Sequence, residues 1–206
     1  MTLKLSVIGI GYLGATHAAC MASLGFDVIG FDIETSKIDL LSKGKVPFYE
    51  PDLEDLLAEQ IKSGRLTFTT NINDLADSDV HFICVGTPQI KGGNAADLKY
   101  VDSALEAIAK IVKPCGLVVG KSTVPVGTAT RLRNRLLELN PKVDLAWNPE
   151  FLREGFAVED TLRPNRLVVG VVNDSAERIL KEVYASNLKE NTPWVRADLP
   201  TESWSK

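Results

Sequence analysis

The chain alternates between short apolar runs and segments in which apolar residues return every three or four positions. The short runs are rich in β-branched residues and are predicted to be buried strands. They cover residues 5–10, 26–31, 65–70, 80–85, 117–120, 143–147, 166–172 and 193–196. The periodic segments are typical of helices and cover residues 15–24, 36–42, 53–63, 71–76, 97–112, 126–139 and 174–184.

Strands and helices take turns along the whole chain, and this order predicts an α/β fold. The sheet is expected to be doubly wound and mostly parallel, with helices on both of its faces. We expect a single domain over residues 1–196. The side chains of Asp52 and Asp174 stand where helices begin, so we expect them to cap those helices.

Three glycines follow the first predicted strand in the spacing G-x-G-x-x-G, at Gly9, Gly11 and Gly14, and the second strand ends at Asp32. In a βαβ unit such a turn lets the backbone approach a pyrophosphate and presents a helix N-terminus to it. An acid after the second strand accepts from a ribose 2′-hydroxyl and repels a 2′-phosphate, which favours NAD over NADP. The spacing alone also fits a tight turn that binds nothing. Together with the flanking strand, helix and acid, it favours a Rossmann-like cofactor domain.

Polar residues follow three later strands at the point where each strand ends. The carboxyl ends of parallel strands meet at one edge of a sheet, and ligands bind beyond that edge. The clusters therefore predict a binding site, although Thr87 alone also fits an ordinary turn. Lys37 is equally consistent with a solvated lysine and with a ribose contact. The three clusters are Gly86-Thr87-Pro88, Ser122-Thr123 and residues 148–154.

Composition narrows the classes of partner. The formal net charge is -4 with acids and bases interspersed, so we expect no nucleic-acid partner. No apolar run approaches the ~20 residues of a membrane span, and the first run leads into the glycine turn as a strand, not a signal peptide. We therefore expect no membrane partner. Cys20, Cys84 and Cys115 are far apart without metal-ligand spacing, so we expect core residues, no metal site and a reducing, cytoplasmic location.

Six motifs occur together and in order: GIGYLG, GKVPFYEPDLEDLL, VGTP, KSTVPVGT, NPEFLREG and RPNRLVVG. With them the chain, from residue 3 to about residue 201, resembles the NAD-binding domain of the UDP-glucose/GDP-mannose dehydrogenase family. STVPVGT with NPEFLREG favours the UDP-glucose branch over the UDP-aminosugar branch. The resemblance implies NAD as the cofactor and UDP-glucose as the substrate of the full-length enzyme.

In that family a primary alcohol is oxidised to a carboxylate in two NAD-dependent steps, through a thioester on a cysteine. The resemblance implies roles by position. The implied cofactor contacts are Gly9, Gly11, Tyr12, Leu13, Gly14, Asp32, Lys37, Gly86, Thr87, Pro88, Ser122, Thr123 and Glu154. The implied substrate contacts are Glu150, Phe151, Leu152, Arg153 and Glu154. The implied catalytic residues are Thr123 and Glu150, which position or activate the hydrolytic water, and Glu154 at the cofactor–substrate junction.

Some parts of the family pattern are not matched. The family's catalytic cysteine lies in a substrate-binding half that this sequence does not contain, and we expect Cys20, Cys84 and Cys115 to lie out of reach of the cofactor. Lys206 falls in register with the family's oxyanion lysine, but the residues before it depart from the T-A-E-x-x-K pattern. Residues 197–206 are thus either the start of an interdomain linker or an unrelated tail. The helix that builds the family dimer is also missing, and we expect this chain alone to bind NAD without turnover.

Two other functions stay open at this point. One is a dinucleotide-binding module without catalysis, and the other is the cofactor domain of a related UDP-aminosugar, GDP-mannose or 3-hydroxyacid dehydrogenase. Glu150 and Glu154 favour an enzyme, because a pure binding module has no need of them, although they also fit an acidic i, i+4 pair on a solvated turn.

Overall fold

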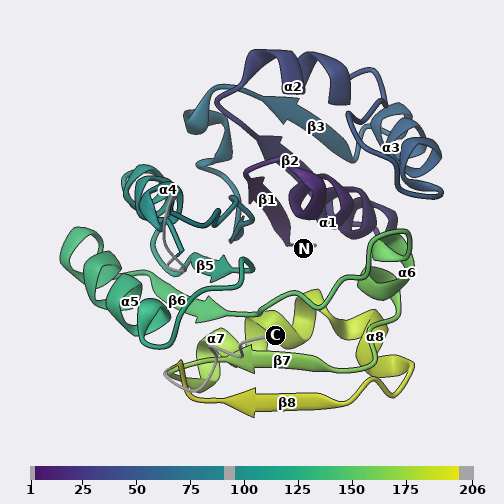
Figure 1. The fold of residues 1–206 in the computed structure, drawn as a ribbon. Coiled ribbons are helices and arrows are strands. Elements are labelled where there is room, and N and C mark those ends of the chain that lie inside the picture. Colours follow the sequence, from purple (N-terminus) through teal and green to yellow (C-terminus); the bar gives the residue numbers. More distant parts are fainter. Residues whose placement is uncertain (1–2, 91–95, 200–206) are drawn as a thin grey trace.

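A computed structural model describes residues 3–90 and 96–199, in which the strands form one eight-stranded sheet (Figure 1). Neighbouring strands are parallel except β6 and β7, which meet antiparallel at Trp147 and Gly170. The doubly wound, mostly parallel sheet is thus confirmed. Its order is β3 (Leu66–Thr69), β2 (Asp27–Phe31), β1 (Lys4–Ile8), β4 (Val80–Ile83), β5 (Leu117–Gly120), β6 (Asp144–Trp147), β7 (Leu167–Gly170) and β8 (Trp194–Ala197).

Helices cover both faces of the sheet (Figure 1). Two of them, α6 and α8, were not predicted, because six and five residues are too few to show a hydrophobic period. The helical elements are α1 (Tyr12–Ser23), α2 (Thr35–Leu41), α3 (Leu53–Lys62), the 3-10 turn η1 (Ile72–Leu75), α4 (Lys99–Ala109), α5 (Thr128–Leu139), α6 (Ala157–Leu162), α7 (Asp174–Val183) and α8 (Ala185–Lys189).

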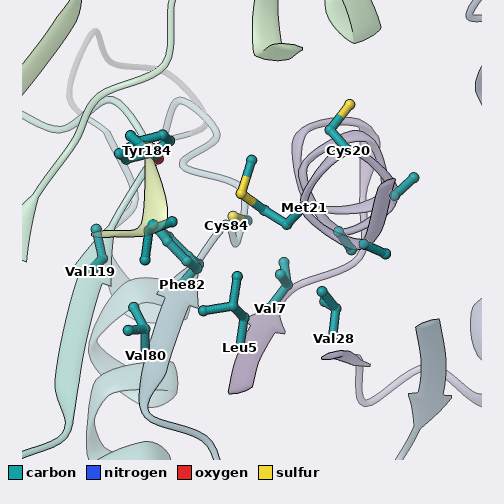
Figure 2. Packing of buried hydrophobic residues seen from close by; sticks show 14 of the residues in the cluster. Leu5, Val7, Cys20, Met21, Val28, Val80, Phe82, Cys84, Val119 and Tyr184 are labelled. Atoms are coloured by element: carbon teal, nitrogen blue, oxygen red, sulfur yellow. The ribbon is translucent and has the colours of Figure 1, made fainter. Parts of the chain in front are cut away.

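Alternating side chains of the strands supply two apolar cores, because successive residues of a strand point to opposite faces. One core packs α1, α3 and α7 against strand residues such as Leu5, Val7 and Phe82, and Figure 2 shows part of it. The other packs α4 and α5 against strand residues such as Ile8 and Ile83. The sheet is therefore covered on both sides, and its loops are left to form binding surfaces at the strand ends.

The two predicted helix caps were wrong in detail. Asn173, not Asp174, is the N-cap of α7: its backbone is extended, and its side chain accepts from the N–H of Ala176 at 2.9 Å. Asp52 does stand at the N-cap of α3, but its side chain makes no capping hydrogen bond. Its backbone is left-handed, with φ 63°, whereas a capping side chain normally acts from an extended backbone.

The glycine turn places α1 closer to the sheet than any side chain allows. A Cβ on Gly14 would lie 2.0 Å from the carbonyl oxygen of Gly9, and a Cβ on Gly9 would lie 2.7 Å from Val85. A Cβ on Gly11, in contrast, meets no described atom within 4 Å. Gly9 and Gly14 are therefore required by packing, whereas the space above Gly11 is open to a ligand.

Both histidines of the chain are buried, at 1% exposure for His17 in α1 and 0% for His81 in β4. The Nδ1 atom of His81 lies 2.7 Å from the hydroxyl of Ser6. The ring of His17 packs edge-on against Phe82, and its two nitrogens have no hydrogen-bond partner among the described residues. Burial lowers the pKa of both imidazoles, to about 4 for His81, so both are neutral at physiological pH.

We expect Gly14→Ala to lower the free energy of unfolding by about 3 kcal/mol, at the upper end of the range for overpacking. Gly11→Ala is the matched control in the same turn. It is expected to lose no more than about 1 kcal/mol, the effect of a poorer N-cap residue. Urea denaturation followed by circular dichroism measures both. Equal losses for the two variants would contradict the packing assigned to Gly14.

We expect stability to fall as the pH is lowered through the histidine range. The unfolded chain takes up protons on both imidazoles below about pH 6.5, whereas the folded chain does not. Protonation therefore stabilises the unfolded state relative to the folded state. Between pH 7.5 and 5.5 the loss for the two histidines together is roughly 2–3 kcal/mol. Urea denaturation at both pH values measures it, and imidazole NMR signals of the folded protein provide the control. An imidazole that titrates near its ordinary pKa in the folded state would refute this account.

Candidate functional site

A cleft of about 1130 Å³ lies beyond the carboxyl ends of β1, β2 and β4. The chain leaves β1 toward β2 on one side and β4 lies on the other, so the cleft is at the point where the strand order reverses. Part of its wall is apolar, from Ile33, Ile72 and Tyr100 among others. The wall also includes these residues expected to bind the cofactor: Gly9, Gly11, Asp32, Lys37, Gly86, Thr87 and Pro88.

Asp32 holds the rim of this cleft together. One carboxylate oxygen, Oδ2, accepts from the N–H of Ile10 at 3.0 Å, and the other accepts from the N–H of Glu34 at 3.1 Å. The ammonium of Lys37 lies 3.4 Å from Oδ2. The carboxylate thus joins the glycine turn to the start of α2. A carboxylate offers about four acceptor positions, so capacity is left for a donor in the cleft.

The loops after β4 and β5 are tied to each other. The hydroxyl of Thr87 donates to the carbonyl of Thr123 at 3.1 Å, and the hydroxyl of Ser122 donates to the carbonyl of Val85 at 2.6 Å. The indole N–H of Trp147, at the end of β6, donates to the carbonyl of Ser122 at 3.1 Å. Thr87 lines the cleft, whereas Ser122 and Thr123 stand behind it and support its rim.

The other predicted cofactor residues of the glycine turn do not line the cleft with their side chains. The hydroxyl of Tyr12 donates to the carboxylate of Glu50, Leu13 packs against the core, and Gly14 lies against Gly9. What these three residues can offer a ligand is the backbone N–H groups of the first turn of α1, which have no partner within the helix.

A second, smaller cavity of about 310 Å³ lies beyond the carboxyl end of β6. Because β7 runs antiparallel to β6, residues 164–166 at the start of β7 border it from the other side. Glu150 on this cavity accepts from the N–H of Leu152 at 2.7 Å, and its own N–H donates to the carbonyl of Lys121 at 3.2 Å. Arg153 is held in a bidentate ion pair with Asp160. The predicted substrate residues Glu150, Phe151, Leu152 and Arg153 all line this cavity, while Glu154 on the same loop is exposed.

A buried polar cluster forms the floor of the second cavity, and sequence reasoning missed it. The ammonium of Lys121 donates to the amide oxygen of Asn148 at 2.9 Å and lies 3.4 Å from the hydroxyl of Tyr184, which donates to the same oxygen at 2.6 Å. Burial lowers the pKa of Lys121 to about 8, and the negative charge of Glu150 opposes this shift. Lys121 and Asn148 are the first residues of the motifs KSTVPVGT and NPEFLREG, but nothing local in the sequence indicates that they are buried together.

The cysteines are placed partly as expected. Cys20 is buried in α1, as expected, whereas Cys115 is exposed in the turn before β5, so its expected place in the core was wrong. Cys84 is buried, as expected, but it also lines the candidate cleft. The reason is that β4 ends at Ile83, two residues before the apolar run does. Cys84 belongs to the same apolar cluster as Met21 (Figure 2). Burial raises the pKa of Cys20 and of Cys84 to about 12, so neither is a reactive thiolate at neutral pH.

Residues 3–90 and 96–199 contain no group of three or more His, Cys, Asp and Glu side chains placed to hold a metal ion. Their helices are all too short or too polar to cross a bilayer. Lys206 lies outside the described residues, as does most of the predicted segment 197–206.

Comparison with known proteins identifies the family to which the chain is similar. A family model described as "UDP-glucose/GDP-mannose dehydrogenase family, NAD binding domain" matches residues 3–188. A UDP-glucose 6-dehydrogenase of Rhizobium meliloti is 43% identical over 198 residues, which are 94% of this chain and 45% of that protein. An uncharacterized protein of Methanocaldococcus jannaschii is 45% identical over 198 residues, 94% of this chain and 22% of that one.

Among solved structures, a UDP-glucose dehydrogenase from Pyrobaculum islandicum superposes with a TM-score of 0.89 at 38% identity, over 97% of this chain and 47% of that chain. The chain therefore spans less than half the length of the relatives it matches. It belongs to the UDP-glucose/GDP-mannose dehydrogenase family of oxidoreductases and corresponds to the NAD-binding domain of that family.

Proposed function

We propose that this chain supplies the cofactor half of an NAD-dependent UDP-glucose 6-dehydrogenase, which oxidises UDP-glucose to UDP-glucuronate in two steps. The observation that carries the proposal is the cleft between Gly11 and Thr87, with the carboxylate of Asp32 on its rim. The choice of substrate is supported by relatives that bear this name and are 43% and 40% identical. The substrate-binding half and its cysteine would come from outside these 206 residues, since none of the three cysteines here suits a nucleophile.

The residues of the cleft fit NAD, which when bound accepts the hydride of each oxidation. The absence of a side chain at Gly11 lets a pyrophosphate approach the backbone, and the first N–H groups of α1 face it. Asp32 has acceptor capacity left for a ribose hydroxyl, and Lys37 at 3.4 Å balances its charge. Gly86, Thr87 and Pro88 form the opposite rim.

We also propose roles for the loop after β6. Glu150 lines the second cavity, and its backbone N–H is bonded to Lys121. Its carboxylate would take a proton from a water molecule there. Thr123 would orient that water. Phe151, Leu152 and Arg153 would face the sugar nucleotide, and Glu154, exposed on the same loop, would stand between cofactor and substrate.

We expect the 206-residue chain to bind NAD at least about tenfold more tightly than NADP, because a 2′-phosphate would meet the carboxylate of Asp32. Asp32→Asn should weaken NAD binding by about 1.5–3 kcal/mol, the value of a hydrogen bond to a charged group. It should also reduce the preference for NAD over NADP. Asp39→Asn removes the same charge from an exposed position on α2 and is the matched control. Calorimetric titration of the wild-type chain and both variants with NAD and with NADP measures the six affinities.

Gly11→Ala completes this experiment. A methyl group at Gly11 meets no described protein atom, so a loss of NAD affinity in a stable Gly11→Ala chain places the pyrophosphate above that residue. Equal affinity of the wild-type chain for NAD and NADP would contradict the role of Asp32 in excluding a 2′-phosphate. Undiminished NAD binding by Gly11→Ala would show that the nucleotide does not bind above the glycine turn.

A further inference from the structure

Glu50 is a buried carboxylate in the connection between α2 and α3, with 5% of its surface exposed. It accepts three hydrogen bonds. The hydroxyl of Tyr12 and the N–H of Gly155 donate to Oε2, the latter at 2.9 Å, and the N–H of Ala157 donates to Oε1 at 2.7 Å. All three donors are uncharged, so hydrogen bonds alone compensate for the loss of water around this group.

The three donors come from two parts of the candidate site. Tyr12 is the first residue of α1 and belongs to the glycine turn. Gly155 follows Glu154 on the loop that leads into α6, Ala157 is the first residue of α6, and α6 packs against α1. One side chain from a third segment thus connects the cofactor turn to the loop that carries Glu150 and Glu154.

The bond to Gly155 acts directly on Glu154. The N–H of Gly155 and the carbonyl of Glu154 belong to one planar peptide unit, so a partner of that N–H sets the orientation of the unit. Gly155 itself has φ 83°, a left-handed conformation that glycine adopts without strain. The backbone on the carboxyl side of Glu154 is therefore defined by a special conformation and by its bond to Glu50.

The arrangement requires an ionised carboxylate. A carboxylate only accepts, whereas the amide of a glutamine has one oxygen that accepts and one nitrogen that donates. Glutamine at position 50 would turn its NH₂ group either toward Tyr12 and Gly155 or toward Ala157, and at least one N–H would face another donor. Burial, followed by the hydrogen bond to Glu50, raises the pKa of Tyr12 above its ordinary value, so the phenol stays protonated as a donor.

We propose that Glu50 is a positioning residue that sets the Glu154–Gly155 peptide relative to the glycine turn, and so couples nucleotide binding at α1 to the order of the Glu154 loop. This inference rests on the proposed function, because the role of Glu154 at the cofactor–substrate junction is itself part of that proposal. Glu54, a nearby acid, has other partners: it pairs with Lys45 and accepts from the N–H of Val46.

The test is amide hydrogen exchange of the 206-residue chain, measured by NMR at Gly155 and Ala157. In Glu50→Gln we expect exchange at these amides to be at least tenfold faster relative to the amide of Phe82 in β4, which reports general destabilisation. Glu54→Gln is the matched control and is expected to leave them unchanged. Glu50→Asp retains the charge and should restore part of the protection. Unchanged exchange in Glu50→Gln overturns the positioning role.

The second measurement repeats the exchange with saturating NAD. We expect NAD to slow exchange at Gly155 and Ala157 at least threefold in the wild-type chain and to have no such effect in Glu50→Gln. If Glu50 only held the loop in place, without coupling, NAD would slow the exchange of these amides in neither protein. NAD that binds the wild-type chain without slowing these amides overturns the coupling and leaves the proposed function intact. A wild-type chain that does not bind NAD overturns the proposed function, while the exchange of the free protein still decides whether Glu50 positions the loop.

If Glu50→Gln does not fold, Glu50→Asp and Tyr12→Phe take its place. Tyr12→Phe retains both bonds to the loop and removes only the connection to α1. It is expected to keep Gly155 and Ala157 protected in the free protein and to lose the slowing by NAD. Slowing by NAD that persists in Tyr12→Phe shows that the coupling does not pass through Glu50, and overturns the proposal.

Discussion

The close contact between α1 and the carbonyl of Gly9 is the constraint on which the cofactor edge depends. With no side chain on Gly14, the helix starts close to the end of β1, beside the cleft that Gly9 and Gly11 line. The same contact places Tyr12 over the segment that holds Glu50. One short distance between two backbones thus determines both where a nucleotide can approach and how the later loop is attached.

Three buried charges surround the strand ends, and each is compensated differently. Asp32 has two backbone N–H groups and a lysine, Glu50 has three neutral donors, and Lys121 has an amide oxygen and a phenol. Burying an ion is unfavourable unless its hydrogen-bonding capacity is met, and even then an apolar replacement is often as stable. Their concentration at one edge indicates that this edge is built for geometry and electrostatics and not for maximal stability.

Hydrophobic pattern was enough to locate the strands, and the glycine spacing with Asp32 located the cleft. Other features could not be predicted from these sequence patterns, for physical reasons. The antiparallel approach of β7 to β6 was missed because apolar runs have no direction. The place of Cys84 on the cleft was not predicted, because an apolar run does not show where strand pairing stops. The contacts of Glu50 and Lys121 are invisible to local patterns, since their partners lie far away in the sequence. The roles of Thr123, Glu150 and Glu154 stay predictions.

The distance in sequence between Glu50 and its partners also bears on how the molecule assembles. Gly155 and Ala157 lie 105 and 107 positions after it, and the strands β4, β5 and β6 intervene. Contacts that close so long a loop form late, because the chain loses conformational entropy before the contacts contribute favourable energy. The glycine turn, made from neighbouring residues, is complete early. We therefore expect the glycine turn to form before the loop with Glu154 becomes attached to it.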